Sequence, residues 1–128
     1  MPNILVIDDD VQFLAYLHRI LTNEGYEVGL ASDGRQGQAL IDEEKFDLLI
    51  TDIFMPVKDG IEVLREIRRR KLEIKIICIS GGGQNCSPEE ALKIVHLLGA
   101  DRILNKPFTK NDLLPLIREL LAGGESSA

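Results

Sequence analysis

Polar side chains able to bind a phosphoryl group or a metal ion follow four of the five short apolar runs in this sequence. Three aspartates come directly after residues 4–7, one follows 47–51, a serine follows 74–79 and a lysine follows 102–105. Because the carboxyl ends of parallel strands meet at one edge of a sheet, we expect these side chains to lie close together. They are Asp8, Asp9, Asp10, Asp52, Ser80 and Lys106.

This set has the composition of a site for a divalent cation and a phosphoryl group. Several carboxylates within a few ångströms repel one another and lower stability unless a cation neutralises them. A small all-oxygen ligand set suits Mg²⁺, which keeps part of its water shell and binds one or two carboxylates with a phosphate oxygen. The ammonium of Lys106 and the hydroxyl of Ser80 add donors for phosphoryl oxygens, and charge stabilisation would then supply most of the catalysis.

Five βα units are predicted to position these residues. Residues 4–7 are continuously apolar, as in an interior parallel strand, whereas residues 26–30 alternate and predict an edge strand. The pattern predicts an α/β fold, a doubly wound parallel sheet with five strands and five helices. The other strands are expected at 47–51, 74–79 and 102–105. The first four helices are expected at 13–21, 34–44, around 63–67 and 87–98, and the first of them has Asp9 or Asp10 as its N-cap. The last helix is expected to begin after a capping box at Thr109–Asp112.

Length, charge and cysteine content exclude several classes of protein. The 128 residues, 45% of them hydrophobic, suffice for one domain at 1–122 with a flexible C-terminal tail at 123–128. The net charge of −6 disfavours direct nucleic-acid binding. Cys78 and Cys86 have no zinc-ligand spacing, and no apolar run is long enough for a signal peptide or a membrane span, so we expect a cytoplasmic protein that does not contact membrane.

Four motifs in order resemble the receiver domains of two-component response regulators, the family of the chemotaxis response regulator. They are ILVIDDD at 4–10, DLLITDIFMPVKDG at 47–60, IICISGG at 76–82 and GADRILNKPF at 99–108. The resemblance covers about residues 3–121. It implies a flavodoxin-like strand order of 2-1-3-4-5 and a signalling phosphoacceptor that promotes only its own phosphorylation and dephosphorylation, rather than an enzyme acting on other substrates.

The resemblance also implies a role for each candidate site residue. Asp52 would be the phosphoacceptor, and Asp8, Asp9, Asp52 and the backbone carbonyl of Phe54 would hold Mg²⁺. Lys106 would contact a phosphoryl oxygen, and Ser80 would swing toward the phosphoryl group to change the loop that follows it. The Lys106–Pro107 peptide bond would be cis.

The partners implied are a sensor histidine kinase or a histidine phosphotransfer protein as phosphoryl donor, and an unidentified downstream protein. A homodimer that forms on phosphorylation is a further candidate. The chain departs from the family pattern at Ile103, where an aromatic residue is common, so we expect the signal to travel through residues 81–83 and the helix after them. The bulky Phe54 predicts slow self-dephosphorylation.

Other functions are less consistent with the residues. Haloacid-dehalogenase-type phosphatases also use an aspartate after the first strand, and Asp8 and Asp10 could supply their two acids. However, Gln12 occupies the position of a Thr or Val in that motif, and only the receiver reading explains Asp52. A flavodoxin-like binding module would need a hydroxyl- and glycine-rich phosphate loop after the first strand. A receiver that only binds partners would not need the complete acidic, serine and lysine set.

Overall fold

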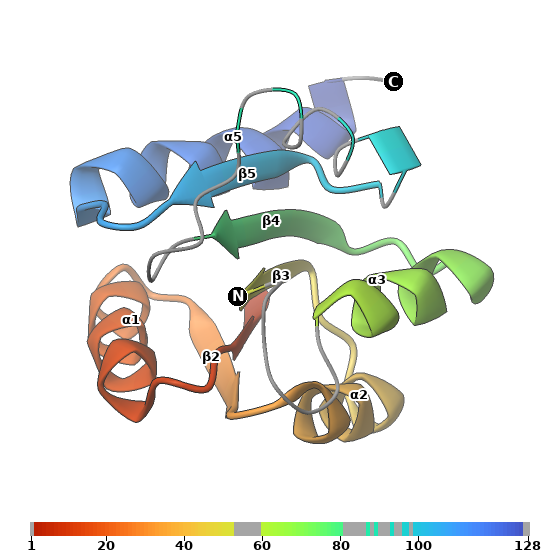
Figure 1. The fold of residues 1–128 in the computed structure, drawn as a ribbon. Helices are drawn as coiled ribbons and strands as arrows, with labels where there is room; N and C mark the ends of the chain where they lie inside the picture. The colour runs from red at the N-terminus through yellow and green to blue at the C-terminus, as the bar shows by residue number, and fades with distance from the viewer. Residues whose placement is uncertain are drawn as a thin grey trace.

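A computed structural model of the chain describes residues 2–52, 60–80, 87, 89, 93, 96, 97 and 99–126. The elements are β1 Asn3–Ile7, α1 Val11–Asn23, β2 Glu27–Ala31, α2 Gly34–Glu43, β3 Leu48–Asp52, α3 Gly60–Arg69, β4 Lys75–Ser80, β5 Arg102–Asn105 and α5 Lys110–Ser126. Strands and helices alternate along the chain as far as β4, and the next described element is β5, followed by α5 (Figure 1).

The five strands form one parallel sheet in the order β2-β1-β3-β4-β5, as expected. β1 is an interior strand and β2 is an edge strand, which confirms the two predictions made from their patterns. The register aligns the carboxyl ends, since Ile7 pairs with Thr51 and Ser80 pairs with Asn105. Residues that follow the strands therefore start from one common edge of the sheet.

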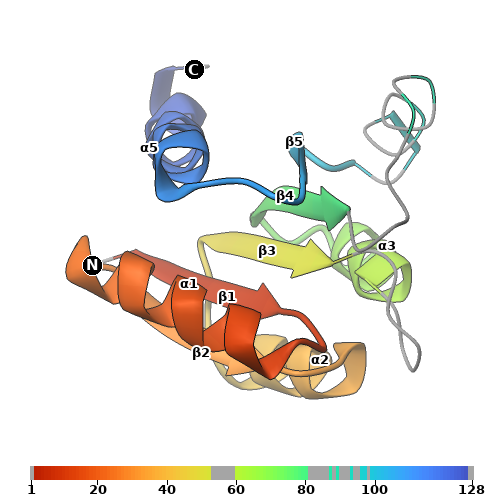
Figure 2. The same ribbon diagram turned by 60° about the vertical axis from the view of Figure 1, so that its left-hand side comes forward.

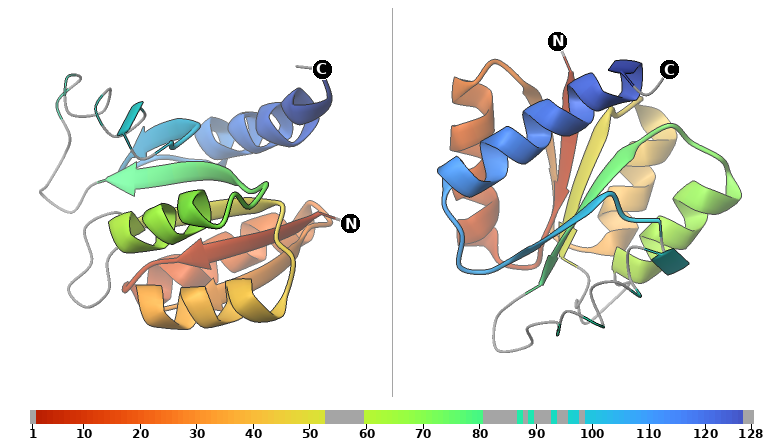
Figure 3. Two further views of the ribbon diagram at one scale, coloured as in Figure 1. Left: turned by 90° about the vertical axis from the view of Figure 1, so that its right-hand side faces the viewer. Right: turned by 90° about the horizontal axis from the view of Figure 1, so that it is seen from above.

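Helices cover both faces of this sheet. α1 and α5 lie on one face, and α2 and α3 lie on the other (Figures 2 and 3). β1 shows why both faces are apolar: Ile4 and Val6 belong to the cluster beneath α1 and α5, whereas Leu5 and Ile7 belong to the cluster beneath α2 and α3. Side chains alternate along a strand, so a continuous apolar run is what a strand buried on both faces requires.

Two local signals at helix starts are confirmed. Asp10, not Asp9, is the N-cap of α1, and its side chain accepts hydrogen bonds from the backbone N–H groups of Gln12 and Phe13 at 3.0 and 3.2 Å. At the start of α5, the Asp112 carboxylate accepts a hydrogen bond from the Thr109 backbone N–H at 2.9 Å. Each cap satisfies an N–H group that has no partner within the helix.

Two expectations concern the C-terminal part of the chain, namely a helix at 87–98 and a flexible tail at 123–128. The fourth of the five predicted helices, at 87–98, falls mostly outside the described residues, and the other four are present as α1, α2, α3 and α5. The last helix continues to Ser126, so it extends into residues 123–128, where the pattern predicts a flexible tail. A glycine in a helix costs only about 1 kcal/mol relative to alanine, so the preceding turns of α5 can continue through two glycines. Within the described residues, no helix is both long enough and apolar enough to cross a membrane.

Candidate functional site

Three carboxylates meet at the carboxyl edge of the sheet. Asp8 follows β1, Asp9 is next to it, and Asp52 ends β3. One carboxylate oxygen from each lies within 4.8 Å of the others, which is close enough for all three to bind one ion. Asp8 is fully buried, Asp52 is half-buried and Asp9 is exposed, so the cluster extends from the protein interior to its surface.

The buried Asp8 is held at both carboxylate oxygens. Its Oδ1 accepts a hydrogen bond from the Asp10 backbone N–H at 2.8 Å, and its Oδ2 accepts one from Lys106 Nζ at 3.1 Å. Burial raises the pKa of Asp8 above its ordinary value, although the Asp10 N–H and the Lys106 ammonium both act in the opposite direction. The protein's own groups therefore do not fully offset the cost of burying this anion.

Lys106 reaches the acidic cluster from the end of β5. Its backbone N–H donates to the Ser80 carbonyl at 2.7 Å, which fixes where the side chain starts. Its Nζ then lies beside Asp8 and 4.1 Å from the centre of the Phe13 ring. The Lys106–Pro107 bond is cis, as expected from the family resemblance.

Ser80 is fully buried at the end of β4. Its hydroxyl donates a hydrogen bond to the Asn105 side-chain carbonyl on the neighbouring strand. Ser80 therefore lies at the same edge as the acidic cluster with its hydroxyl committed to a protein partner. Phe54, expected to supply a backbone carbonyl to the metal, lies outside the described residues. Ile103 is half-buried and packs against the cluster on the α2 and α3 face.

The structure also identifies contacts that the sequence analysis missed. Phe13 is part of the apolar stripe of the first helix, and nothing in the helical pattern shows that its ring reaches Lys106. Asn105 is the partner of the Ser80 hydroxyl. Its position directly before Lys106, at the end of a strand adjacent to β4, is a signal that could have identified it. Asp10 caps α1, which separates its role from that of Asp8 and Asp9 and weakens the phosphatase alternative.

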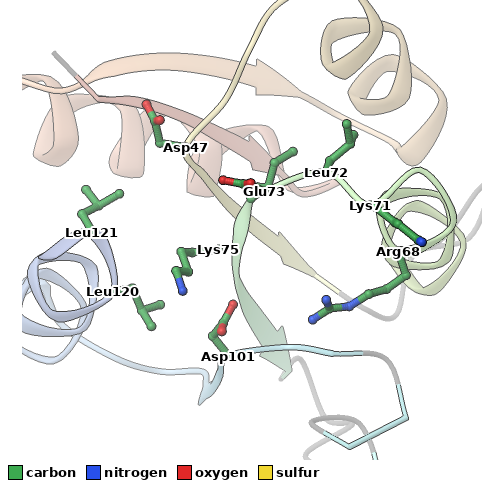
Figure 4. A pocket seen from close by; sticks show the side chains of 10 residues that line it. Asp47, Arg68, Lys71, Leu72, Glu73, Lys75, Asp101, Leu120 and Leu121 are labelled. Carbon is green, nitrogen blue, oxygen red and sulfur yellow. The ribbon is translucent and has the colours of Figure 1, made fainter. Parts of the chain in front are cut away.

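A cleft separate from the acidic cluster lies at the opposite edge of the sheet. It has a volume of ≈810 Å³, and its lining includes Asp47, Lys75 and Asp101, which lie at or just before the starts of β3, β4 and β5 (Figure 4). Its lining carries acidic and basic side chains together with Leu72, Leu120 and Leu121. None of the strand-end candidates lines this cleft, so it is separate from the acidic site.

The parallel sheet with order 2-1-3-4-5 and the acidic cluster at its carboxyl edge define the class of protein. Residues 4–118 match the response regulator receiver domain family. The chain therefore belongs to this family, whose members are the receiver domains of two-component signal transduction systems.

Individual relatives agree with this assignment. The chain is 37% identical over 121 residues to the transcriptional regulatory protein CpxR of Klebsiella pneumoniae, and 34% identical over 126 residues to the alkaline phosphatase synthesis transcriptional regulatory protein PhoP of Bacillus subtilis. These alignments cover 94% and 98% of this chain and 50% of each relative, so the chain spans about half the length of these curated proteins.

A solved structure is similar over nearly its entire length. The CheY-like response regulator receiver domain protein from Methanospirillum hungatei has a TM-score of 0.89 and is 34% identical. The alignment covers 100% of this chain and 99% of that one. The similarity extends through the whole chain, and thus includes both layers of helices and the sheet between them.

Proposed function

We propose that this chain is a phosphoacceptor in which Asp52 receives a phosphoryl group from a phosphohistidine of a partner protein. The observation that carries the proposal is the cluster of Asp8, Asp9 and Asp52, whose oxygens lie within 4.8 Å of one another beside the Lys106 ammonium. A phosphoryl group bound there would meet an acceptor carboxylate, a cation and a nearby serine at one edge of the sheet. Membership in the receiver family supports the same assignment.

In the proposed reaction, a carboxylate oxygen of Asp52 attacks the phosphorus of the donor. A P–O bond forms to Asp52 as the P–N bond to the donor imidazole breaks, and the imidazole nitrogen keeps the electron pair of that bond. Lys106 neutralises charge on the phosphoryl oxygens. Ser80 would exchange its hydrogen bond to Asn105 for one to a phosphoryl oxygen, and this exchange would couple the site to the residues that follow Ser80 in the sequence.

The acidic residues also fit a divalent cation. Their donors are all oxygens, as Mg²⁺ prefers, and the raised pKa of Asp8 indicates that the buried anion is not fully compensated by its protein partners. Asp8, Asp9 and Asp52 would hold the ion with the backbone carbonyl of Phe54. When bound, Mg²⁺ would supply positive charge that offsets repulsion between the acceptor carboxylate and the phosphoryl oxygens.

The donor is proposed to be a sensor histidine kinase or a histidine phosphotransfer protein in the cytoplasm. The output is proposed to be a change in contacts with a downstream protein. The curated relatives are about twice as long as this chain and are named as transcriptional regulators.

The test is the intact mass of the protein after incubation with acetyl phosphate, with and without Mg²⁺. We expect a Mg²⁺-dependent gain of one phosphoryl mass in the wild type and no gain in Asp52→Asn. Asp33→Asn is a matched control, because Asn caps a helix about as well as the Asp33 side chain that caps α2. A gain that survives in Asp52→Asn would place the acceptor elsewhere, and no gain in the wild type with either acetyl phosphate or a phosphorylated histidine kinase would overturn the proposal.

A further inference from the structure

The Lys106 side chain contacts two different groups with its ammonium. On one side Nζ lies 3.1 Å from Asp8 Oδ2, and on another it lies 4.1 Å from the centre of the Phe13 ring. An ammonium within about 6 Å of a ring centre is attracted to the negative face of the aromatic ring. The exposed fraction of the Lys106 side chain is 23%, so this contact is largely shielded from water.

The Phe13 ring is itself held in place. The Phe13 backbone N–H donates to the Asp10 carboxylate at 3.2 Å, which fixes the first turn of α1. The ring meets that of Phe108 edge to face, with centres 5.7 Å apart and planes at 89°. Both rings pack against the cluster beneath α1 and α5. Aromatic pairs prefer this arrangement, so the ring is a fixed surface, unlike a flexible side chain.

The two contacts of Lys106 respond differently to a cation. If Asp8 binds Mg²⁺, as in the proposed function, its oxygens are drawn to the ion and its attraction for Lys106 is weakened. The Phe13 ring carries no net charge and does not bind Mg²⁺ in competition with carboxylates, so we expect its contact with the ammonium to persist when the ion binds. A lysine without such a contact would sample many rotamers, because its side chain has four rotatable carbon–carbon bonds.

We propose that Phe13, braced by Phe108, is a positioning residue that keeps the Lys106 ammonium at the acidic site when a cation occupies Asp8. This inference rests on the proposed function and adds a residue that acts through Lys106 without touching the phosphoryl group. Positioning a charged group before the reaction lowers the entropy that must be lost during it. From the usual strength of a partly shielded cation–π contact, we expect loss of the ring to slow phosphorylation about five-fold.

The test compares Phe13→Leu, Phe13→Tyr and the wild type. Leucine keeps apolar bulk but removes the ring face, whereas tyrosine keeps the face. The matched control is Phe46→Leu, because Phe46 is buried in the cluster on the opposite side of the sheet. A loss of stability alone would affect this control as well as Phe13→Leu.

Two readouts separate positioning from phosphorylation. In protein labelled with ¹³C-lysine, the ε-methylene protons of Lys106 should be shifted upfield by the ring current, with and without Mg²⁺, and the signal is assigned by its loss in Lys106→Met. The shift should persist in Phe13→Tyr and Phe46→Leu and disappear in Phe13→Leu. The second readout is the rate of phosphorylation by acetyl phosphate, which should fall about five-fold in Phe13→Leu and return in Phe13→Tyr.

Several results would overturn the inference. They are an unshifted Lys106 signal in the wild type, a shift that collapses when Mg²⁺ is added, an unchanged rate in Phe13→Leu, and an equal decrease in Phe46→Leu. If the wild type accepts no phosphoryl group from any donor, the proposed function fails. In that case the positioning of Lys106 is still decided by the methylene shift with and without Mg²⁺.

Discussion

Replacement of Asp8 by asparagine should stabilise the folded protein at neutral pH. Asp8 is fully buried, and its carboxylate lies within 4.8 Å of those of Asp9 and Asp52. Asparagine has nearly the same shape, and its Oδ1 can still accept the hydrogen bond from the Asp10 N–H. The substitution therefore removes one buried negative charge with little change in packing.

The magnitude follows from two unfavourable contributions and one favourable one. The larger unfavourable contribution is desolvation of the buried carboxylate. The smaller is repulsion: two unit charges 4.8 Å apart repel by about 3.5 kcal/mol at an effective dielectric of 20 and by about 1 kcal/mol in water, and the exposure of Asp9 favours the lower figure. The ion pair with Lys106 at 3.1 Å is favourable. The raised pKa of Asp8 shows that the unfavourable contributions are larger. We expect a net gain of about 1 kcal/mol, or roughly 2–8 °C in the melting temperature.

The gain should depend on pH in a defined direction. Because the pKa of Asp8 is raised in the folded state, the folded chain binds this proton more tightly than the unfolded chain does. Ionised Asp8 therefore lowers the free energy of unfolding above its folded pKa, and this cost disappears as pH falls toward the ordinary value of 3.8. The advantage of Asp8→Asn should be complete at pH 7.5 and should shrink as the pH is lowered through that window.

Urea denaturation followed by circular dichroism would measure this gain, with Asp33→Asn as the control. Mg²⁺ provides an independent check, because a ligand at ten times its Kd stabilises the folded state by about 1.4 kcal/mol. The wild type should gain this stability and Asp8→Asn should gain less. A destabilised Asp8→Asn at pH 7.5 would refute the reasoning, since the ion pair with Lys106 would then outweigh repulsion and burial. An advantage equally large at pH 4 would show that charge is not its cause.

Three further substitutions test other contacts. Gly37→Ala should cost about 1–3 kcal/mol in urea denaturation, because a Cβ there would lie 2.2 Å from Ile7 Cδ1, and Ile7→Val should recover part of the loss. Asp101→Ala should cost about 1–2 kcal/mol by removing the acceptor 2.8 Å from the buried Ile76 N–H, whereas Asp101→Asn should keep most of the stability; equal losses would contradict this. Lys106→Met should lower stability at pH 7.5, because it removes the ion pair with the buried Asp8. It should also slow phosphorylation by acetyl phosphate roughly ten-fold or more, because it removes the positive charge beside the phosphoryl oxygens. An unchanged rate would exclude Lys106 from the reaction.

Most of the architecture could be predicted from the sequence because it depends on local patterns. A strand buried on both faces requires a continuous apolar run, and residues 4–7 have one. The alternating edge strand, the Thr109–Asp112 capping box and the ends of the strands follow from equally short-range chemistry. The strand order could not be predicted from local patterns, and its prediction came from the resemblance to a family.

The arrangement of side chains at the site required the tertiary structure. The sequence placed Asp8, Asp9, Asp52, Ser80 and Lys106 at the ends of strands, which is enough to predict that they lie at one edge. It left open whether Asp9 or Asp10 caps α1, because two adjacent aspartates have the same local chemistry. The backbone path after β1 decides this, since it turns Asp10 toward the Gln12 and Phe13 N–H groups.

Two pairings at the site also depend on packing between distant elements. The Phe13 ring meets the Lys106 ammonium, and the Ser80 hydroxyl meets Asn105, only once the sheet has formed and α1 has packed against it. By itself, therefore, the sequence determined the sheet, its helices and the set of candidate site residues, because backbone geometry and burial act over a few residues. The folded structure decided which side chain each candidate residue contacts, because those contacts join residues that are far apart along the chain and are selected by the shape of the whole core.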